Sequence, residues 1–286
     1  MAVVKMNFLS KMLGFQTNIT ICLPSFSFAD AYNGRPDVYV PGMKYQVLYL
    51  LHGGSGDDSD YVNFTNIVRY ADDNKIAVIM PNDYNACYTD SLDGSIKYYS
   101  FLTEELPLVC RTMFPISDKR EDTFVAGLSM GSHGAMKIAI NNPDKFAACL
   151  CMSGASTRPG VPTMVPTKDG VFDFDAPKPK IPLGEITQKI EEPYFIRGTV
   201  NDIYAVAKAN ADAGKELPKM FFRVGDCDHA LYRAQKAEAD LRSWGYETKI
   251  EVVKGLGPEW DLWDETLRIA IKDWLPIKHQ ILYPEG

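Results

Sequence analysis

The feature that most constrains how this chain can fold is an alternation of short apolar runs with longer segments of helical periodicity. Strand-like runs occur at residues 18–23, 45–51, 76–81, 123–126, 147–152, 219–224 and 248–253. Helical patterns occur between or after them, at residues 61–73, 99–113, 130–141, 231–244 and 261–275. Most of the runs are almost continuously apolar, which is typical of strands covered on both faces. The pattern therefore predicts an α/β fold with a mainly parallel, doubly wound sheet.

We expect a single domain over residues 1–286. Two segments of it depart from the alternation of strands and helices. The run at 18–23 is closer to alternating, so we expect an antiparallel strand at an edge of the sheet. Residues 156–215 are rich in proline, glycine and charge, with a weak helical pattern at 202–212. Such excursions are usually functional, and we predict a cap over the carboxyl ends of the strands. The alternative is a surface insertion that does not contact substrate.

The composition limits the partners and the compartment. The chain has 30 Lys and Arg against 37 Asp and Glu and no long basic stripe, which argues against nucleic-acid and anionic-membrane partners. It shows no secretory leader and no apolar stretch of membrane-spanning length. A chain of this size needs no disulfides, so its six cysteines are interpreted as free thiols. We expect a cytoplasmic protein, and a homo-oligomer is compatible with this composition.

A candidate nucleophile follows the run at 123–126. Gly127-Leu-Ser-Met-Gly131 matches the G-x-S-x-G turn, with a buried strand before it and a helical pattern after it. A sharp strand-to-helix turn exposes the serine side chain and requires small neighbours. We therefore expect Ser129 to act as a nucleophile, with the backbone N–H of Met130 directed at an oxyanion.

A second glycine-rich loop follows the run at 45–51. Leu50-Leu-His-Gly-Gly-Ser-Gly56 has the composition of a loop that supplies the other oxyanion donor. Gly54 is the expected donor, with Gly53 or Ser55 as alternatives. We expect His52 to orient the loop and, with Gly53, to lie at the substrate pocket. Phosphate binding is disfavoured, because neither the Walker A lysine nor the G-x-G-x-x-G spacing is present.

Several blocks of the sequence resemble one known family. They are Phe8-Leu-Ser-Lys-Met-Leu-Gly14, Leu50-Leu-His-Gly-Gly54, Tyr88-Thr-Asp90, Glu104-Glu-Leu-Pro107, Lys119-Arg-Glu-Asp-Thr-Phe-Val-Ala-Gly-Leu-Ser-Met-Gly131 and Ser153-Gly-Ala155. They are similar to blocks of the esterases related to tributyrin esterase, S-formylglutathione hydrolase (esterase D), and feruloyl and acetyl-xylan esterases. The resemblance covers nearly the whole chain and implies the α/β-hydrolase fold, a three-layer sandwich, with no metal or other cofactor. It also implies hydrolysis of short acyl esters, so the expected partner is a small-molecule ester.

In this fold the catalytic serine is followed along the chain by an acid and then by a histidine. The family's Gly-x-x-Asp pattern matches Gly225-Asp-Cys-Asp228, which implies that Asp228 is the acid, with Asp226 as the alternative. Family members commonly show His-x-Trp-x-x-Trp-Asp after the last strand. This chain reads Pro-Glu-Trp-Asp-Leu-Trp-Asp over residues 258–264, so Pro258 stands where the resemblance places the base.

Proline takes up no proton, so a base must come from one of the four histidines or from a carboxylate. His229 is the first candidate, if its loop turns the ring toward Ser129. Asp228 would orient it, or Asp226 would, because adjacent residues rarely pair in this way.

Three other side chains are further candidates for the base. His133 follows the nucleophile on the same helix, where we expect it to face away or to pack under the cap. His279 lies in a C-terminal tail that could reach a neighbouring subunit. Glu259 could serve if burial raised its pKa; otherwise it is a solvated loop charge.

Two other groups of residues have alternative interpretations. Cys227-Asp-His229 is compact, but zinc sites need three or four ligands at distributed spacings, so we expect no metal. Trp260, together with Trp263, Tyr88 and Tyr98, could form an aromatic pocket for substrate, and a core role for at least one tryptophan is equally compatible.

These observations predict a serine carboxylesterase for acetyl- or feruloyl-type esters, acting through an acyl-enzyme on Ser129. One alternative is a catalytically impaired homologue that keeps the pocket for a ligand or partner, as Pro258 suggests. The other is an acyltransferase that uses the same nucleophile.

Overall fold

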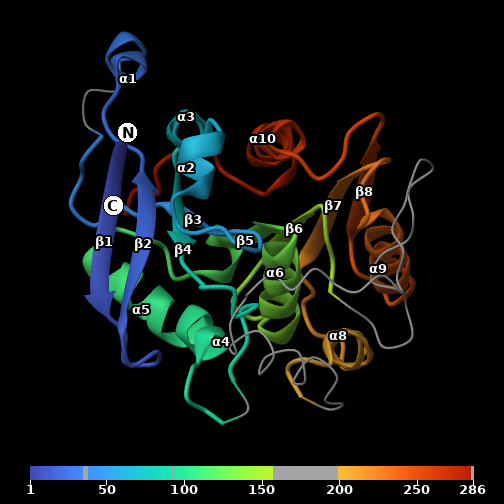
Figure 1. Cartoon of the computed structure of the whole chain (residues 1–286). Coiled ribbons are helices and arrows are strands. Elements are labelled where there is room, and N and C mark those ends of the chain that lie inside the picture. The colour runs from blue at the N-terminus through green and yellow to red at the C-terminus, as the bar shows by residue number, and fades with distance from the viewer. Residues whose placement is uncertain (35–37, 92, 157–198, 285–286) are drawn as a thin grey trace.

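The computed structural model describes residues 1–34, 38–91, 93–156 and 199–284. The described residues form one eight-stranded sheet in the order β1-β2-β4-β3-β5-β6-β7-β8 (Figure 1). The strands are β1 (Ala2–Leu9), β2 (Gln16–Leu23), β3 (Gln46–Leu51), β4 (Ile76–Pro81), β5 (Thr123–Leu128), β6 (Ala148–Met152), β7 (Lys219–Gly225) and β8 (Thr248–Val253). β2 is antiparallel to both its neighbours, and all later pairs are parallel. The predicted fold class is confirmed.

Helices cover both faces of the sheet (Figure 1). One face carries α5 (Leu106–Met113), α6 (Met130–Asn141), α8 (Ile203–Asp212) and α9 (Leu231–Ser243). The other face carries α2 (Asp60–Phe64), α3 (Ile67–Asp73) and α10 (Trp260–Ile269). Shorter helical pieces are α1 (Phe28–Tyr32), α4 (Tyr98–Ser100), a 3₁₀ turn (Arg120–Asp122) and two π-helical turns (Phe101–Glu105 and Ala270–Trp274). None of the described helices is long and apolar enough to cross a membrane.

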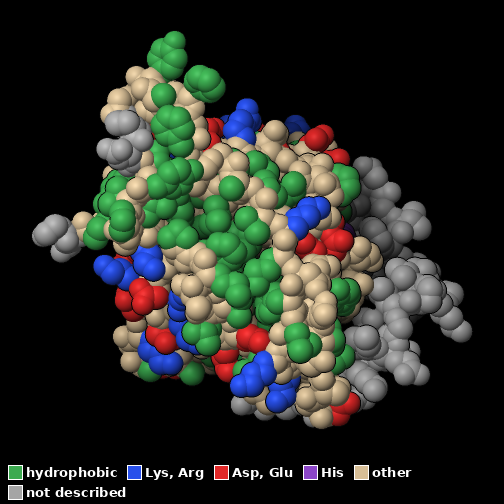
Figure 2. All heavy atoms as spheres, turned by 90° about the vertical axis from the view of Figure 1, so that its left-hand side faces the viewer, with side chains coloured by type: hydrophobic (Ala, Val, Ile, Leu, Met, Phe, Trp, Pro, Cys, Tyr) green, Lys and Arg blue, Asp and Glu red, His purple; other side chains and the backbone are tan. Residues whose placement is uncertain are grey.

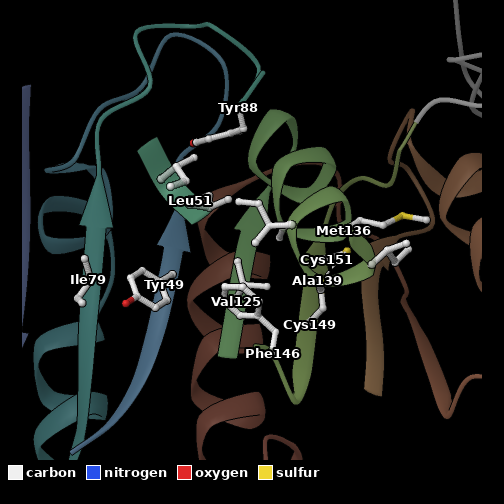
Figure 3. Close-up of a cluster of buried hydrophobic side chains, with 14 of the residues drawn as sticks. Tyr49, Leu51, Ile79, Tyr88, Val125, Met136, Ala139, Phe146, Cys149 and Cys151 are labelled. Carbon is white, nitrogen blue, oxygen red and sulfur yellow. Dashed lines mark hydrogen bonds between the residues drawn. The ribbon is translucent and has the colours of Figure 1, made fainter. Parts of the chain in front are cut away.

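The alternation of side chains along the strands produces two cores. In β3, Val47, Tyr49 and Leu51 join the core beneath α6, while Leu48 and Leu50 join the core beneath α3 and α10. Figure 3 shows the first of these cores, where Tyr49 and Leu51 lie beside side chains from the neighbouring strands and from α6. Every residue of β3 is buried, so the strand reads as a continuous apolar run.

The edge of the sheet differs from the prediction. The run at 18–23 belongs to β2, but it is not an edge strand, because β1 pairs with it along its whole length. β1 was not predicted from the sequence. In β1 only the alternate residues Val4, Met6 and Phe8 are partly buried against the core. The exposed residues between them interrupt the apolar run by which the other strands were predicted.

Hydrophobic side chains gather on this side of the molecule (Figure 2). The exposed apolar residues on β1, on α1 and beside them include Val3, Leu9, Phe15, Phe28 and Tyr32, and the last two are 88% and 91% exposed. The predicted homo-oligomer stays a prediction.

The helix predicted at 61–73 is divided into α2 and α3. Thr65 leaves the helical path with an extended backbone, and its hydroxyl donates to the Tyr61 carbonyl at 2.6 Å. The Asn66 N–H then donates to Asp264 Oδ1 at 2.7 Å. This partner comes from α10, so local periodicity alone could not reveal the break.

The predicted cap falls mostly on residues 157–198, which lie outside the described residues, so it stays a prediction. The described end of that range contains α8, which packs against α6. Asn210 Nδ2 donates to the Ile140 carbonyl at 2.7 Å, and Asn141 Nδ2 donates to the Val200 carbonyl at 2.9 Å. α8 is thus part of the helical layer on that face of the sheet.

Candidate active site

Ser129 lies at the sharp turn between β5 and α6. Its φ is +51°, a left-handed conformation that is uncommon for residues other than glycine. A Cβ on Gly127 would lie 2.2 Å from the Gly131 carbonyl oxygen, and a Cβ on Gly131 would lie 2.2 Å from that of Leu51. The Ser129 N–H donates to the Met152 carbonyl at 2.9 Å. Its side chain is partly exposed.

Gly131 and Gly54 are predicted to differ in how far substitution by alanine destabilises the fold. Gly131→Ala is expected to lower the free energy of unfolding by about 1–3 kcal/mol, because the added methyl overpacks the contact with β3. Gly54→Ala is the matched control, since a Cβ there meets nothing within 4 Å and should change stability little. Urea unfolding of both variants measures the difference, and equal midpoints would contradict the packing described here.

The loop after β3 lies against this turn. A Cβ on Gly53 would lie 2.4 Å from Leu128 Cδ1, whereas Gly54 is open. His52 Nε2 accepts the Asp83 N–H at 2.9 Å, so the ring proton is on Nδ1, which donates to the Gly53 carbonyl at 2.7 Å. Burial lowers the pKa of His52, which favours this neutral form. Since the side chain is 1% exposed and both nitrogens are engaged, we assign His52 to the support of the loop rather than to the lining of the pocket.

Asp228 follows β7 and is 2% exposed. Its Oδ1 accepts the Ala230 N–H at 2.8 Å, while its Oδ2 has no hydrogen-bond partner in the described part of the chain. An unsatisfied buried carboxylate oxygen is unfavourable unless a function retains it. Asp226 points elsewhere: its Oδ1 accepts the Gly255 N–H at 2.7 Å, and that hydrogen bond lowers its pKa. Of the two aspartates, Asp228 therefore has the geometry of an orienting acid.

The loop that carries Pro258 is fixed against the Asp228 loop by main-chain contacts. The Cys227 N–H donates to the Leu256 carbonyl at 3.0 Å. A Cβ on Gly225 would lie 1.9 Å from the same oxygen, so only glycine allows the approach. Pro258 itself is exposed. The backbone at the expected base position is thus held close to the acid, but its side chain offers no base.

His229 is the histidine nearest in the chain to the acid. Its Nδ1 lies 3.6 Å from Asp228 Oδ1, too far for a hydrogen bond, and its side chain is 24% exposed.

The other candidates for the base lie in different settings. His133 is on the buried side of α6, where burial and the positive charge of Lys137 lower its pKa. His279 is exposed, and its Nδ1 lies 2.8 Å from Asn74 Oδ1, near the amino end of β4 and hence at the opposite end of the sheet from Ser129. Glu259 is exposed and accepts a backbone N–H of its own loop, so the burial required of a carboxylate base is lacking.

The aromatic residues divide between the core and a cluster beside α2. Tyr88 and Tyr98 are 0% and 1% exposed, so their predicted place in a substrate pocket is wrong. Trp263 is also largely buried, with its ring 5.0 Å from that of Trp260. Trp260 is half-buried, and its ring stacks on that of Phe64 with centroids 4.9 Å apart, so it is the most exposed of these four residues.

Two buried charged residues near the site were not among the residues predicted from the sequence. Lys137 on α6 and Asp83 after β4 are both fully buried. The sequence offered one signal for Lys137: it is a charged residue within the otherwise apolar helical run at 134–140, which indicates a buried lysine. No three His, Cys, Asp or Glu side chains among the described residues are placed to hold a metal ion.

Comparison with known proteins gives a consistent result. The family model described as "Putative esterase" matches residues 30–251. An acetyl esterase of Caldicellulosiruptor saccharolyticus is 27% identical over 279 residues, covering 96% of this chain and 98% of that one. The S-formylglutathione hydrolase of Staphylococcus aureus has a TM-score of 0.76 at 27% identity, covering 96% and 98% of the two chains. The fluorophosphonate-binding serine hydrolase F of Staphylococcus aureus has a TM-score of 0.74 at 28% identity, with the same coverage.

Proposed function

Because the chain belongs to this esterase family and is a carboxylic ester hydrolase, we propose that it cleaves short acyl esters through an acyl-enzyme on Ser129. The observation that carries the proposal is the left-handed turn that presents the Ser129 hydroxyl beside the glycine loop after β3. The similarity to a serine hydrolase that binds fluorophosphonate supports it.

The proposed steps follow from this arrangement. The Ser129 oxygen attacks the ester carbonyl carbon, and a base takes the hydroxyl proton. The resulting oxyanion accepts hydrogen bonds from the N–H groups of Gly54 and Met130, and the latter is at the first turn of α6, where amides have no intrahelical acceptor. The base returns its proton to the departing alcohol. Water then attacks the acyl-enzyme by the same route and releases the acid.

We assign the base to His229, with Asp228 as its orienting acid. His229→Gln is expected to lower kcat by about 10²–10⁴-fold, the range contributed by general bases. His279→Gln, at the other end of the sheet, is the control and should keep wild-type kcat. Steady-state hydrolysis of p-nitrophenyl acetate measures both. A His229→Gln variant with wild-type kcat would remove His229 from the mechanism.

For the substrate we propose a short acyl group of the acetyl or feruloyl type on a small alcohol. The acetyl esterase and S-formylglutathione hydrolase relatives favour small acyl groups. Trp260 provides an aromatic surface on which a feruloyl ring could stack. Comparison of kcat/KM for p-nitrophenyl acetate, p-nitrophenyl butyrate and methyl ferulate separates these classes.

The test of the proposed function is direct detection of the acyl-enzyme. A fluorophosphonate probe should add its mass to the peptide that contains Ser129, and p-nitrophenyl acetate should give a burst of one p-nitrophenol per active site if deacylation is the slower step. Labelling of another residue, or no labelling together with no turnover, would overturn the proposal. Added alcohol that diverts most of the acyl group into a new ester would identify acyl transfer rather than hydrolysis.

A further inference from the structure

The segment at residues 82–90, here called the clamp loop, lies between α6 and the glycine-rich loop after β3 (residues 52–56), here called the oxyanion loop. Its backbone is left-handed at four residues other than glycine, namely Tyr84, Asn85, Cys87 and Tyr88. Such conformations are unfavourable and persist only where surrounding contacts enforce them. The clamp loop is therefore shaped by its neighbours on both sides.

Three hydrogen bonds join the clamp loop to the oxyanion loop. The Asp83 N–H donates to His52 Nε2 at 2.9 Å, and the Tyr88 hydroxyl donates to the His52 carbonyl at 2.7 Å. Asn85 Oδ1 accepts the Ser55 N–H at 2.5 Å. These bonds hold the residues immediately before and after the two loop glycines, so the direction of the Gly54 N–H depends on the clamp loop.

Lys137 joins the clamp loop to α6 from the other side. Its ammonium group donates to Thr89 Oγ1 at 2.8 Å and to the Tyr88 carbonyl at 3.2 Å, and it lies 5.1 Å from the centre of the Tyr99 ring. The packing is close as well, since a Cβ on Gly134 would lie 2.3 Å from the Tyr88 ring. One side chain of the nucleophile helix thus fixes the end of the clamp loop.

The charges involved are fully buried. Asp83 accepts the Tyr88 N–H through both carboxylate oxygens, at 3.0 and 3.1 Å. Burial raises the pKa of Asp83 and lowers the pKa of Lys137 to about 7. A buried lysine is unfavourable unless its N–H groups are satisfied, and replacing it would leave the Thr89 oxygen and the Tyr88 carbonyl with one donor fewer.

We infer that Lys137 is a positioning residue: through Thr89 and the clamp loop it holds the oxyanion loop in register with Ser129. This inference rests on the proposed function, because it assigns the Gly54 N–H to an oxyanion. Lys137 itself touches neither substrate nor Ser129. Its effect is on the relative placement of the two oxyanion donors, which come from separate loops, and a displacement of either one weakens transition-state binding without weakening ground-state binding.

The test uses matched substitutions. Thr89→Val keeps the shape of the side chain but removes one of the two acceptors of the Lys137 ammonium, together with the hydroxyl's own hydrogen bond to the Cys87 carbonyl at 2.9 Å. Thr89→Ser restores the hydroxyl. Lys137→Met removes the donor itself. Lys75→Met is the control, because Lys75 is also largely buried, pairs with Asp30 at 3.0 Å, and precedes β4 at the far end of the sheet.

Hydrogen–deuterium exchange of the folded variants gives a readout that does not depend on activity. Thr89→Val and Lys137→Met should accelerate exchange in the peptides that cover residues 52–56 and 82–90, while Thr89→Ser and Lys75→Met should not. On p-nitrophenyl acetate, the first two should lose about 10- to 100-fold in kcat with KM unchanged, less than the loss on deleting an oxyanion donor. Unchanged exchange at 52–56 in both variants would overturn the inference. Absence of wild-type turnover would instead overturn the proposed function, and the exchange comparison would still decide the role of Lys137.

Discussion

Ser129→Ala is expected to abolish saturable hydrolysis of p-nitrophenyl acetate, with a loss in kcat of at least about 10³-fold. Removal of the nucleophile from an intact triad costs about 10⁶-fold. We expect a smaller factor here because Pro258 stands at the usual base position, so wild-type Ser129 is less activated. The same variant should also lose all labelling by a fluorophosphonate probe.

Ser132→Ala is the matched control for this experiment. Ser132 lies on the same turn, but its hydroxyl donates to the Gly127 and Met152 carbonyls at 2.8 and 2.6 Å rather than facing the site. Its loss should lower the melting temperature and leave probe labelling intact. If Ser129→Ala retained wild-type kcat, the turn between β5 and α6 would be structural only.

Pro258→His is expected to raise kcat by up to about 10²-fold, because it adds a base beside Asp228 that is better oriented than His229, whose Nδ1 lies 3.6 Å from Asp228 Oδ1. The main chain around residue 258 is already held against the Asp228 loop. Asp228 Oδ2 is buried and has no partner among the described residues, so it can accept an imidazole N–H. The activity of this variant should fall as the pH drops below about 6.5, the ordinary pKa of histidine, because a protonated imidazole cannot take the Ser129 proton.

Pro258→Ala is the control for this gain, since it removes the ring without adding a base. Adding Asp228→Asn to Pro258→His should remove most of the increase, because the new imidazole loses its orienting charge. Should Pro258→His be no faster than Pro258→Ala, while His229→Gln is inactive, then His229 already serves as a full base and residue 258 is irrelevant to proton transfer.

Much of this arrangement could be predicted from local sequence. Buried parallel strands are apolar throughout, so the predicted bounds of β3 to β8 agree with the structure to within two residues, and those of α6 agree fully. The tight turn at Ser129 was predictable because its glycines are dictated by contacts with backbone atoms, which no other residue allows.

The features of the fold and of the site that could not be predicted depend on contacts between segments that are distant in the chain. The division of α2 from α3 follows from Asp264, almost two hundred residues later in the chain. The role inferred for Lys137 depends on its hydrogen bonds to residues 88 and 89. The local sequence of α6 or of the clamp loop does not reveal this contact. The orientation of His229 relative to Asp228 depends on how the loop after β7 closes, and periodicity carries no information about loops.

The exposed ring of Pro258 on a backbone held by main-chain contacts also has a genetic consequence. Histidine and proline codons of the form CAY and CCY differ by a single nucleotide. The side chain at this position is exposed, so the exchange of the two residues does not disturb the buried core. A lineage with this fold can therefore gain or lose an imidazole at this position by one point mutation.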